Sequence, residues 1–197
     1  MSETLFVDVE PDVSICVERW PAASAGAPTV LALHGFSSNR LVFAGLAEAF
    51  QGQVELIAVD CRGRGRSSSP GEGSRYGMRR HADDAAAVLR SLGSQEVVVV
   101  GTSMGAWIAT QLAAHHADLV TALVFVDGGC LPVLPPGTDP VEFINLGLLG
   151  SLDRMDLLLP DVEVVLGAMK SGPGLGEVWD SHVEASVREG FEQLEGG

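Results

Sequence analysis

The sequence predicts an α/β fold built on a mostly parallel sheet. Between residues 29 and 126, short apolar runs alternate with segments of helical apolar spacing, which is typical of parallel strands joined by helices. The first twenty residues instead hold two β-rich pieces close together, which predicts an antiparallel start. Beyond residue 130 only helix-like patterns follow. We therefore expect six strands followed by a helical region.

The first half of the predicted order starts with strands at residues 4–9 and 13–20. They are separated by Glu10-Pro11-Asp12, which favours a hairpin. Residues 29–34, TVLALH, form a short apolar run between breakers and predict a buried strand. Apolar residues at helical spacing then predict a helix over 41–50.

The second half repeats the alternation. Strands are predicted at 54–60, 96–100 and 120–126, and helices at 79–92 and 104–116. The order after the hairpin is therefore strand, helix, strand, helix, strand, helix, strand. This order predicts right-handed crossovers and parallel pairing.

The C-terminal third carries only helical signals. Asp139-Pro140 is a candidate N-cap with proline at the first helical position, and further helices are expected at 162–169 and 175–194. Residues 1–130 hold 9 basic and 14 acidic residues, whereas residues 131–197 hold 3 and 12. We expect a core over 1–130 and a helical cap over 131–197.

Composition narrows the classes of function. At 197 residues, of which 46% are hydrophobic, the chain has the length of one domain. A net charge of −14 argues against nucleic-acid binding, and no apolar run reaches the ~18 residues of a membrane span. The expected partner is a small-molecule substrate, with no cofactor and no metal. The acidic N-terminus has no basic segment of the secretory type, so a cytoplasmic protein is expected.

The three cysteines do not suggest a metal site. Cys16, Cys61 and Cys130 are odd in number and widely spaced, without a CxxC pair. Buried free thiols are the preferred interpretation.

The clearest chemical motif is Gly101-Thr102-Ser103-Met104-Gly105. It is a Gly-x-Ser-x-Gly pattern with a predicted strand before it and a predicted helix after it. The serine has to sit in a strained turn, so the residues two before and two after it must be small. An ordinary tight turn is the alternative, and the strand–helix context favours a nucleophilic serine.

Several co-ordered segments resemble the α/β-hydrolase superfamily. LALHGF (31–36) is similar to its oxyanion turn, DCRGRGRSS (60–68 and the serine after it) to its Asp-x-Arg-Gly-x-Gly-x-Ser loop, and LVFVDGG (123–129) to its sixth strand. The resemblance implies that Ser103 is the nucleophile. It also implies that the backbone N–H groups of Phe36 and Met104 form the oxyanion hole.

The loop after the second parallel strand is rich in arginine. Six arginines between residues 62 and 80 make up half of all basic residues. We expect them to pair with nearby acids rather than to form an anion site. Gly63-Arg64-Gly65 begins like a dinucleotide fingerprint, but the third glycine is missing, so nucleotide binding is a weak alternative.

The resemblance implies the chain order serine, acid, histidine, yet few histidines follow Ser103. His115 and His116 lie about 18 Å along the predicted helix, too far to act as its base. His182 is a candidate base, although a packed or substrate-lining histidine is the commoner role on an apolar helix face. His34 and His81 are set aside by position in the family.

The acid is also open. Asp127, after the sixth strand, is either the acid used by some family members or a turn residue before Gly128-Gly129. The resemblance implies two more strands, the usual acid and then the histidine, which the sequence up to Gly197 does not contain. A truncated gene, an incomplete sequence and a degenerate hydrolase are the alternatives, and truncation of a serine hydrolase is the preferred interpretation. Without them, residues 120–126 would form an apolar edge that favours self-association.

These observations predict a serine hydrolase for an ester, thioester or similarly activated carbonyl bond of a small apolar substrate. A serine at this position argues against the family members that use an aspartate nucleophile. The alternative is a non-catalytic binding or interaction fragment that keeps the pocket and lacks the base.

Overall fold

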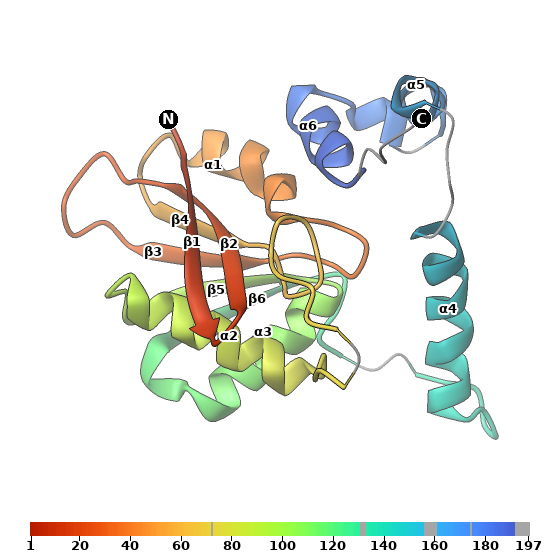
Figure 1. The fold of residues 1–197 in the computed structure, drawn as a ribbon, viewed down its shortest axis with the longest axis horizontal. Helices are drawn as coiled ribbons and strands as arrows, with labels where there is room; N and C mark the ends of the chain where they lie inside the picture. The colour runs from red at the N-terminus through yellow and green to blue at the C-terminus, as the bar shows by residue number, and fades with distance from the viewer. Residues whose placement is uncertain (72, 131–132, 156–160, 174, 192–197) are drawn as a thin grey trace.

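Six strands form one sheet in the order β1-β2-β4-β3-β5-β6 (Figure 1). A computed structural model of the chain describes residues 1–71, 73–130, 133–155, 161–173 and 175–191. The strands are β1 (Glu3–Glu10), β2 (Val13–Trp20), β3 (Thr29–Leu33), β4 (Glu55–Val59), β5 (Val97–Thr102) and β6 (Val120–Val126). β2 pairs antiparallel with β1 and β4, and every other pairing is parallel. The mostly parallel sheet with an antiparallel start is confirmed.

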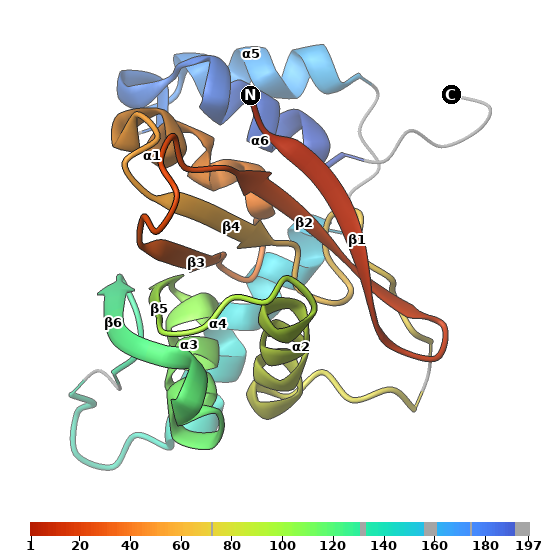
Figure 2. The ribbon, with the colours of Figure 1, turned by 90° about the vertical axis from the view of Figure 1, so that its left-hand side faces the viewer.

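Helices cover both faces of this sheet. The helices of the described residues are η1 (Arg40–Phe43), α1 (Ala44–Phe50), α2 (Met78–Ser91), α3 (Met104–His115), η2 (Ala117–Leu119), α4 (Pro140–Met155), α5 (Val162–Ser171), η3 (Leu175–Val178) and α6 (Ser181–Glu189), and four of them, η1, α1, α2 and α3, pack on the sheet. One buried cluster joins the sheet to α2 and α3, and a second joins the opposite face to η1 and α1. The molecule is therefore layered, with α2 and α3 on one side and α1 on the other (Figure 2).

The parallel strands explain why the sequence folds this way. β3 and β4 are buried along nearly their whole length, as expected for continuous apolar runs covered on both faces. In β5, buried and half-buried residues alternate. The carboxyl ends of β3, β5 and β6 meet at one edge of the sheet, where the loops that carry the candidate site begin.

Two predicted helices are divided in the structure. The helix expected over 41–50 begins as η1, because Asn39 Oδ1 accepts the Leu41 N–H at 3.0 Å, and continues as α1. The helix expected over 175–194 is wrong as one element. Asp180 Oδ1 accepts the His182 and Val183 N–H groups at 2.8 Å and starts α6 anew after η3. Residues 192–194 lie outside the described residues.

The N-terminal end of α4 follows the sequence prediction. Asp139 Oδ1 accepts the Val141 N–H at 2.7 Å, and Pro140 is the first helical residue. α4 stands beside the rest of the molecule in Figure 1, and it exposes several large apolar side chains. These are Val141, Phe143, Ile144, Leu146, Leu148 and Leu149. The boundary between core and cap near residue 130 stays a prediction.

β6 lies at one edge of the described sheet. Val124, Phe125 and Val126 are each 44–46% exposed. An apolar edge strand is a site of association in many proteins. The expected self-association through β6 stays a prediction.

Two of the three cysteines match expectation. Cys16 and Cys61 are buried and free, and burial raises the pKa of the Cys16 thiol to about 11. Cys130 is exposed, so the expectation that it is buried was wrong. Of the helices in the described ranges, none has the length and apolar character needed to cross a bilayer.

Candidate active site

Ser103 occupies the sharp turn from β5 into α3. Its backbone has φ 51° and ψ −113°, a strained conformation for a residue with a side chain. The Ser103 N–H donates to the Val126 carbonyl at 2.9 Å, and the Ser103 carbonyl accepts the Ala106 N–H at 3.0 Å. The end of β6 and the first turn of α3 therefore hold the strained residue from both sides.

Glycines make this turn possible. A Cβ at Gly101 would lie 2.6 Å from Ala106 Cα, and one at Gly105 would collide with the Leu33 carbonyl oxygen. A Cβ at Gly128 would lie 2.8 Å from Ser103 Cα. The two motif glycines are small for the steric reason that the sequence suggested, and Gly128 adds a third constraint from the loop after β6.

The turn after β3 lies directly against Ser103. A Cβ at Gly35 would be 3.4 Å from Ser103 Cβ and 4.0 Å from Ser103 Oγ. Phe36 follows Gly35, and Met104 follows Ser103. Within the described ranges, neither the Phe36 nor the Met104 N–H has a recorded acceptor. These two amides, one after the turn that contacts Ser103 and one directly after Ser103, are the donors that the sequence predicts for an oxyanion hole, and that role stays a prediction.

His34 holds that turn through hydrogen bonds at both ring nitrogens. The carbonyl of Gly35 can only accept, so His34 Nδ1 carries the proton of their 2.6 Å hydrogen bond, and Nε2 accepts the Cys61 N–H at 2.9 Å. The side chain is fully buried, and burial lowers its pKa. Both ring nitrogens are occupied, so His34 is a neutral structural residue.

The glycine-rich loop after β4 closes on Asp60. A Cβ at Gly65 would lie 2.7 Å from Asp60 Oδ1, and the Arg66 N–H donates to Asp60 Oδ2 at 2.9 Å. Arg40 adds its own N–H at 2.7 Å and its Nη1 at 2.9 Å. The loop glycine therefore makes room for a carboxylate of this chain, which gives the dinucleotide interpretation no support.

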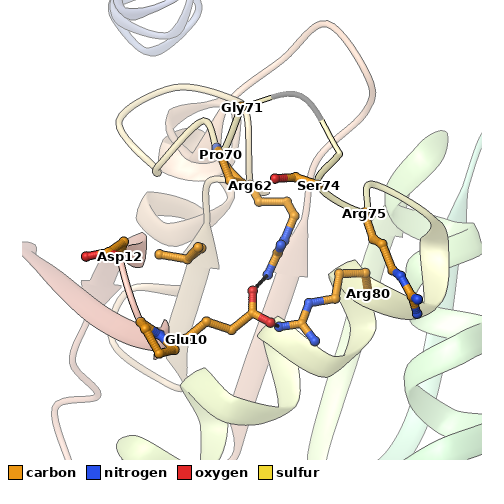
Figure 3. A pocket seen from close by; sticks show the side chains of 10 residues that line it. Glu10, Asp12, Arg62, Pro70, Gly71, Ser74, Arg75 and Arg80 are labelled. Atoms are coloured by element: carbon orange, nitrogen blue, oxygen red, sulfur yellow. Dashed lines mark hydrogen bonds and ion pairs between the residues drawn. The ribbon is translucent and has the colours of Figure 1, made fainter.

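Three of the six loop arginines, Arg62, Arg79 and Arg80, pair with acids among the described residues, as expected. Arg62 makes two 2.6 Å hydrogen bonds to Asp84 and one of 3.1 Å to Glu10, which also pairs with Arg80. Figure 3 shows Glu10 between these two arginines, in a pocket of about 540 Å³. This pocket lies at the β1–β2 hairpin and is not lined by Ser103, so we assign it to the ion-pair network.

Arg64 and Arg66 do not follow this pattern. Arg64 Cζ lies 4.5 Å from the centre of the Phe36 ring, and Arg66 Cζ lies 5.2 Å from that of Phe6. Arg64 Nε also donates to the Phe36 carbonyl at 2.7 Å. The sequence prediction treated all six arginines alike and missed the contact between Arg64 and Phe36. The Arg-Gly-Arg-Gly-Arg pattern distinguishes these three arginines from the rest, but it does not indicate their partners.

No histidine ring has a recorded hydrogen bond to the Ser103 hydroxyl, and all five histidines lie in the described ranges. His116 Nε2 is 2.8 Å from Asp83, and His115 is exposed on the surface at the far end of α3. His182 Nε2 lies 2.6 Å from Glu48 Oε2, on α1. His182, the candidate base, is therefore engaged elsewhere.

Two further residues are His81, which the sequence set aside, and Asp127, which it left open. His81 is buried with Nδ1 unpartnered, and burial, followed by the charges of Arg62 and Arg64, lowers its pKa to about 4. Asp127 is exposed with φ 50°, directly before Gly128. The positive φ and the following glycine suit a turn residue. No group of three His, Cys, Asp or Glu side chains in the described chain is placed to hold a metal.

A model of the α/β hydrolase fold matches residues 28–178. The chain belongs to this family. It is 38% identical to 2-(acetamidomethylene)succinate hydrolase of Mesorhizobium japonicum over 100 residues, which is 51% of this chain and 35% of that protein. It is 32% identical to fluoroacetate dehalogenase of a Burkholderia species over 129 residues, 64% of this chain and 40% of that one.

The fold of a solved relative is also similar. The crystal structure of E-2-(acetamidomethylene)succinate hydrolase superposes with a TM-score of 0.80 at 25% identity, covering 100% of this chain and 67% of that one. The chain spans about a third to two fifths of the length of these two curated relatives. The α/β-hydrolase fold is confirmed, and the similar proteins with printed activities include hydrolases.

Proposed function

We propose that the protein is a serine hydrolase in which Ser103 Oγ attacks an ester, thioester or similarly activated carbonyl bond of a small, largely apolar substrate. One observation carries the proposal. Ser103 is held in a strained turn between two residues, Phe36 and Met104, whose amides have no recorded acceptor in the described ranges. Residues held in such conformations cluster at active sites.

The proposed reaction is acyl transfer followed by hydrolysis. Ser103 Oγ bonds to the carbonyl carbon, the hydroxyl proton passes to a base, and the Phe36 and Met104 N–H groups stabilise the developing oxyanion. The N-terminus of α3 adds a favourable dipole at the same point. Collapse of the tetrahedral intermediate releases the alcohol or thiol, and water then cleaves the acyl-serine.

A fluorophosphonate probe tests for the activated hydroxyl. We expect labelling of the native chain and its loss in Ser103→Ala, because Ser103 is the serine with a positive φ among the described residues. Ser69→Ala, in an exposed loop, is the matched control and should label like the native chain. Hydrolysis of p-nitrophenyl butyrate should fall by about 10³-fold or more in Ser103→Ala. Labelling that survives in Ser103→Ala would contradict the proposal.

The second candidate is a binding module without turnover. It is favoured by the absence of any histidine ring at the Ser103 hydroxyl, since a serine hydroxyl is a weak nucleophile without a base. A folded native chain that fails to label would support this candidate. His182→Ala tests a further possibility, that His182 is the base although its ring contacts Glu48 in this structure. Loss of labelling there would mean that α6 brings His182 from Glu48 to Ser103 during the reaction.

A further inference from the structure

Arg64 differs from the other buried cation in its loop. Two residues away, Arg62 is bound by Asp84 and Glu10, and the hydrogen bonds that it donates to Asp84 raise its pKa. Arg64 is half-buried and has no carboxylate partner among the described residues, and burial lowers its pKa. A guanidinium stays charged in a protein, so Arg64 is a partly desolvated positive charge without a counter-ion.

The hydrogen bonds of Arg64 leave donors unused. Its Nε donates to the Phe36 carbonyl and its Nη1 to the Gly63 carbonyl, both at 2.7 Å. No described residue accepts from Nη2. The fully buried side-chain nitrogens without a partner are Arg80 Nε and His81 Nδ1, so Arg64 Nη2 is accessible to solvent. The guanidinium is thus fixed by two carbonyls and by the Phe36 ring, while one edge stays open.

The Phe36 backbone relates the Arg64 guanidinium to the turn beside Ser103. The Phe36 N–H proposed for the oxyanion hole and the Phe36 carbonyl held by Arg64 belong to one residue. Backbone geometry then puts Arg64 Nε within about 6 Å of the Phe36 nitrogen. The Arg64 guanidinium therefore lies close enough to the Phe36 N–H for a substrate bound there to present a carboxylate to it across a short carbon chain.

We propose that Arg64 binds a carboxylate of the substrate, so that the preferred acyl group is a short dicarboxylic acid monoester or monothioester. This inference rests on the proposed function for the position of the reacting carbonyl. The rest of the acyl chain remains apolar, in agreement with the proposed substrate. Arginine suits the role because its planar donors match a carboxylate and its face stacks on an aromatic ring.

Arg66 provides a matched control. It lies in the same loop, stacks on an aromatic ring and has no carboxylate partner in the described part of the chain. It is exposed and contacts Phe6 of β1 instead of the turn beside Ser103. If the positive charge alone attracted the carboxylate, neutralising either arginine would weaken binding. If the position of the guanidinium beside Phe36 matters, only the neutralisation of Arg64 would do so.

Binding tests the inference without requiring turnover. In full-length Ser103→Ala protein, calorimetric titration should show monomethyl succinate binding more tightly than dimethyl succinate. Adding Arg64→Gln should weaken the monoanion by about 10- to 100-fold and leave the neutral diester within about threefold. Adding Arg66→Gln should change neither. Equal affinity for the two ligands, no binding of the monoanion, or no effect of Arg64→Gln would overturn the inference.

Turnover separates this inference from the proposed function. Mono-p-nitrophenyl succinate and its neutral methyl ester should both be hydrolysed through Ser103, and Arg64→Gln should lower kcat/KM about 10- to 100-fold for the anionic ester alone. Equal losses on both esters would mean that Arg64 only positions Phe36, which overturns carboxylate binding. If neither ester is hydrolysed while the binding difference persists, the hydrolase proposal fails and the carboxylate site stands.

Discussion

The serine turn and the helices α4 to α6 differ in how tightly they are packed. Around Ser103, backbone packs on backbone, so Gly101, Gly105 and Gly128 leave no room for a methyl group. In α4 and α5, large apolar side chains such as Phe143 and Val164 are exposed. The serine turn is over-determined by its neighbours, whereas the helical region depends on a few side-chain contacts. Strain can persist only in the first kind of environment.

Three polar contacts connect the helix α6 to the core. Asn39 Nδ2 donates to the Ser186 carbonyl at 2.7 Å, and Arg40 Nη1 is 2.8 Å from Glu189 Oε1. His182 reaches Glu48 on α1. All three pairs join α6 to the segment η1–α1, and α6 packs against both of these elements. The position of α6 therefore depends on a short stretch after the β3 turn that contacts Ser103, which links the helical region to the candidate site.

The largest difference should appear when one methyl group is added in each region. Gly105→Ala would force its Cβ into the Leu33 carbonyl, and backbone on both sides cannot yield. We expect a loss of more than about 4 kcal/mol in unfolding free energy, or failure to fold. Gly167→Ala, inside α5 with no atom within 4 Å of its Cβ, should instead stabilise the chain by about 0.5–1 kcal/mol.

Urea denaturation monitored by circular dichroism measures both changes. The control is the pair itself, because the same substitution is made at two helical glycines. Similar small effects at both positions would show that the β5–α3 turn has room to relax. The comparison between a packed turn and an open helical region would then fail.

An intermediate effect is expected from pH, through the buried His81. In the unfolded chain its pKa is near 6.5, and in the folded chain burial lowers it to about 4. Protonation of His81 therefore favours the unfolded chain, and the fold has its full stability only while His81 is neutral. This stability is fully present above pH 6.5 and is lost as pH falls towards 4, by about 2 to 3 kcal/mol.

His81→Phe removes the titrating ring and keeps an aromatic side chain. The variant should show a smaller decline in unfolding free energy between pH 6.5 and 4.5 than the native chain. The measurement is urea denaturation at several pH values in that range. Parallel declines for the two proteins would mean that His81 is not buried in its neutral form.

The sequence predicted the packed region better than the helical one, for a physical reason. Gly-x-Ser-x-Gly carries its own steric requirements within five residues, so the strained turn at Ser103 and the small neighbours follow from local pattern. The strands follow likewise, because apolar runs covered on both faces have few alternative structures.

The contacts that the sequence did not predict join residues that are far apart in the chain. Glu48 is 134 residues from His182, and Arg64 is 28 residues from Phe36, so no local spacing indicates either contact. The break before α6 had a local signal in Asp180-Ser181, which the continuous apolar stripe concealed. Long-range polar contacts are decided by the folded geometry, and the serine turn is decided largely by its own residues.

The smallest effect is expected at the contact between the two regions. Glu189→Gln removes one of the three carboxylates that pair with Arg40, and Asp60 and Glu18 remain as its partners. Arg40 therefore stays compensated, and we expect a loss of only about 1 kcal/mol. Because the remaining partners belong to the core, the loss should be local. It should increase opening of α6 and leave the sheet unchanged.

Hydrogen exchange read by mass spectrometry distinguishes local from global opening. In Glu189→Gln, amides of α6 should exchange several-fold faster, while those of β3 and β5 keep the native rate. Glu177→Gln, an exposed residue of η3 with no recorded ion pair, is the matched charge control and should exchange like the native chain. Faster exchange throughout the sheet would mean that Glu189 supports the core through Arg40. The two regions would then form one cooperative unit, because a charge on α6 would help to hold Asp60 and the loop that closes on it.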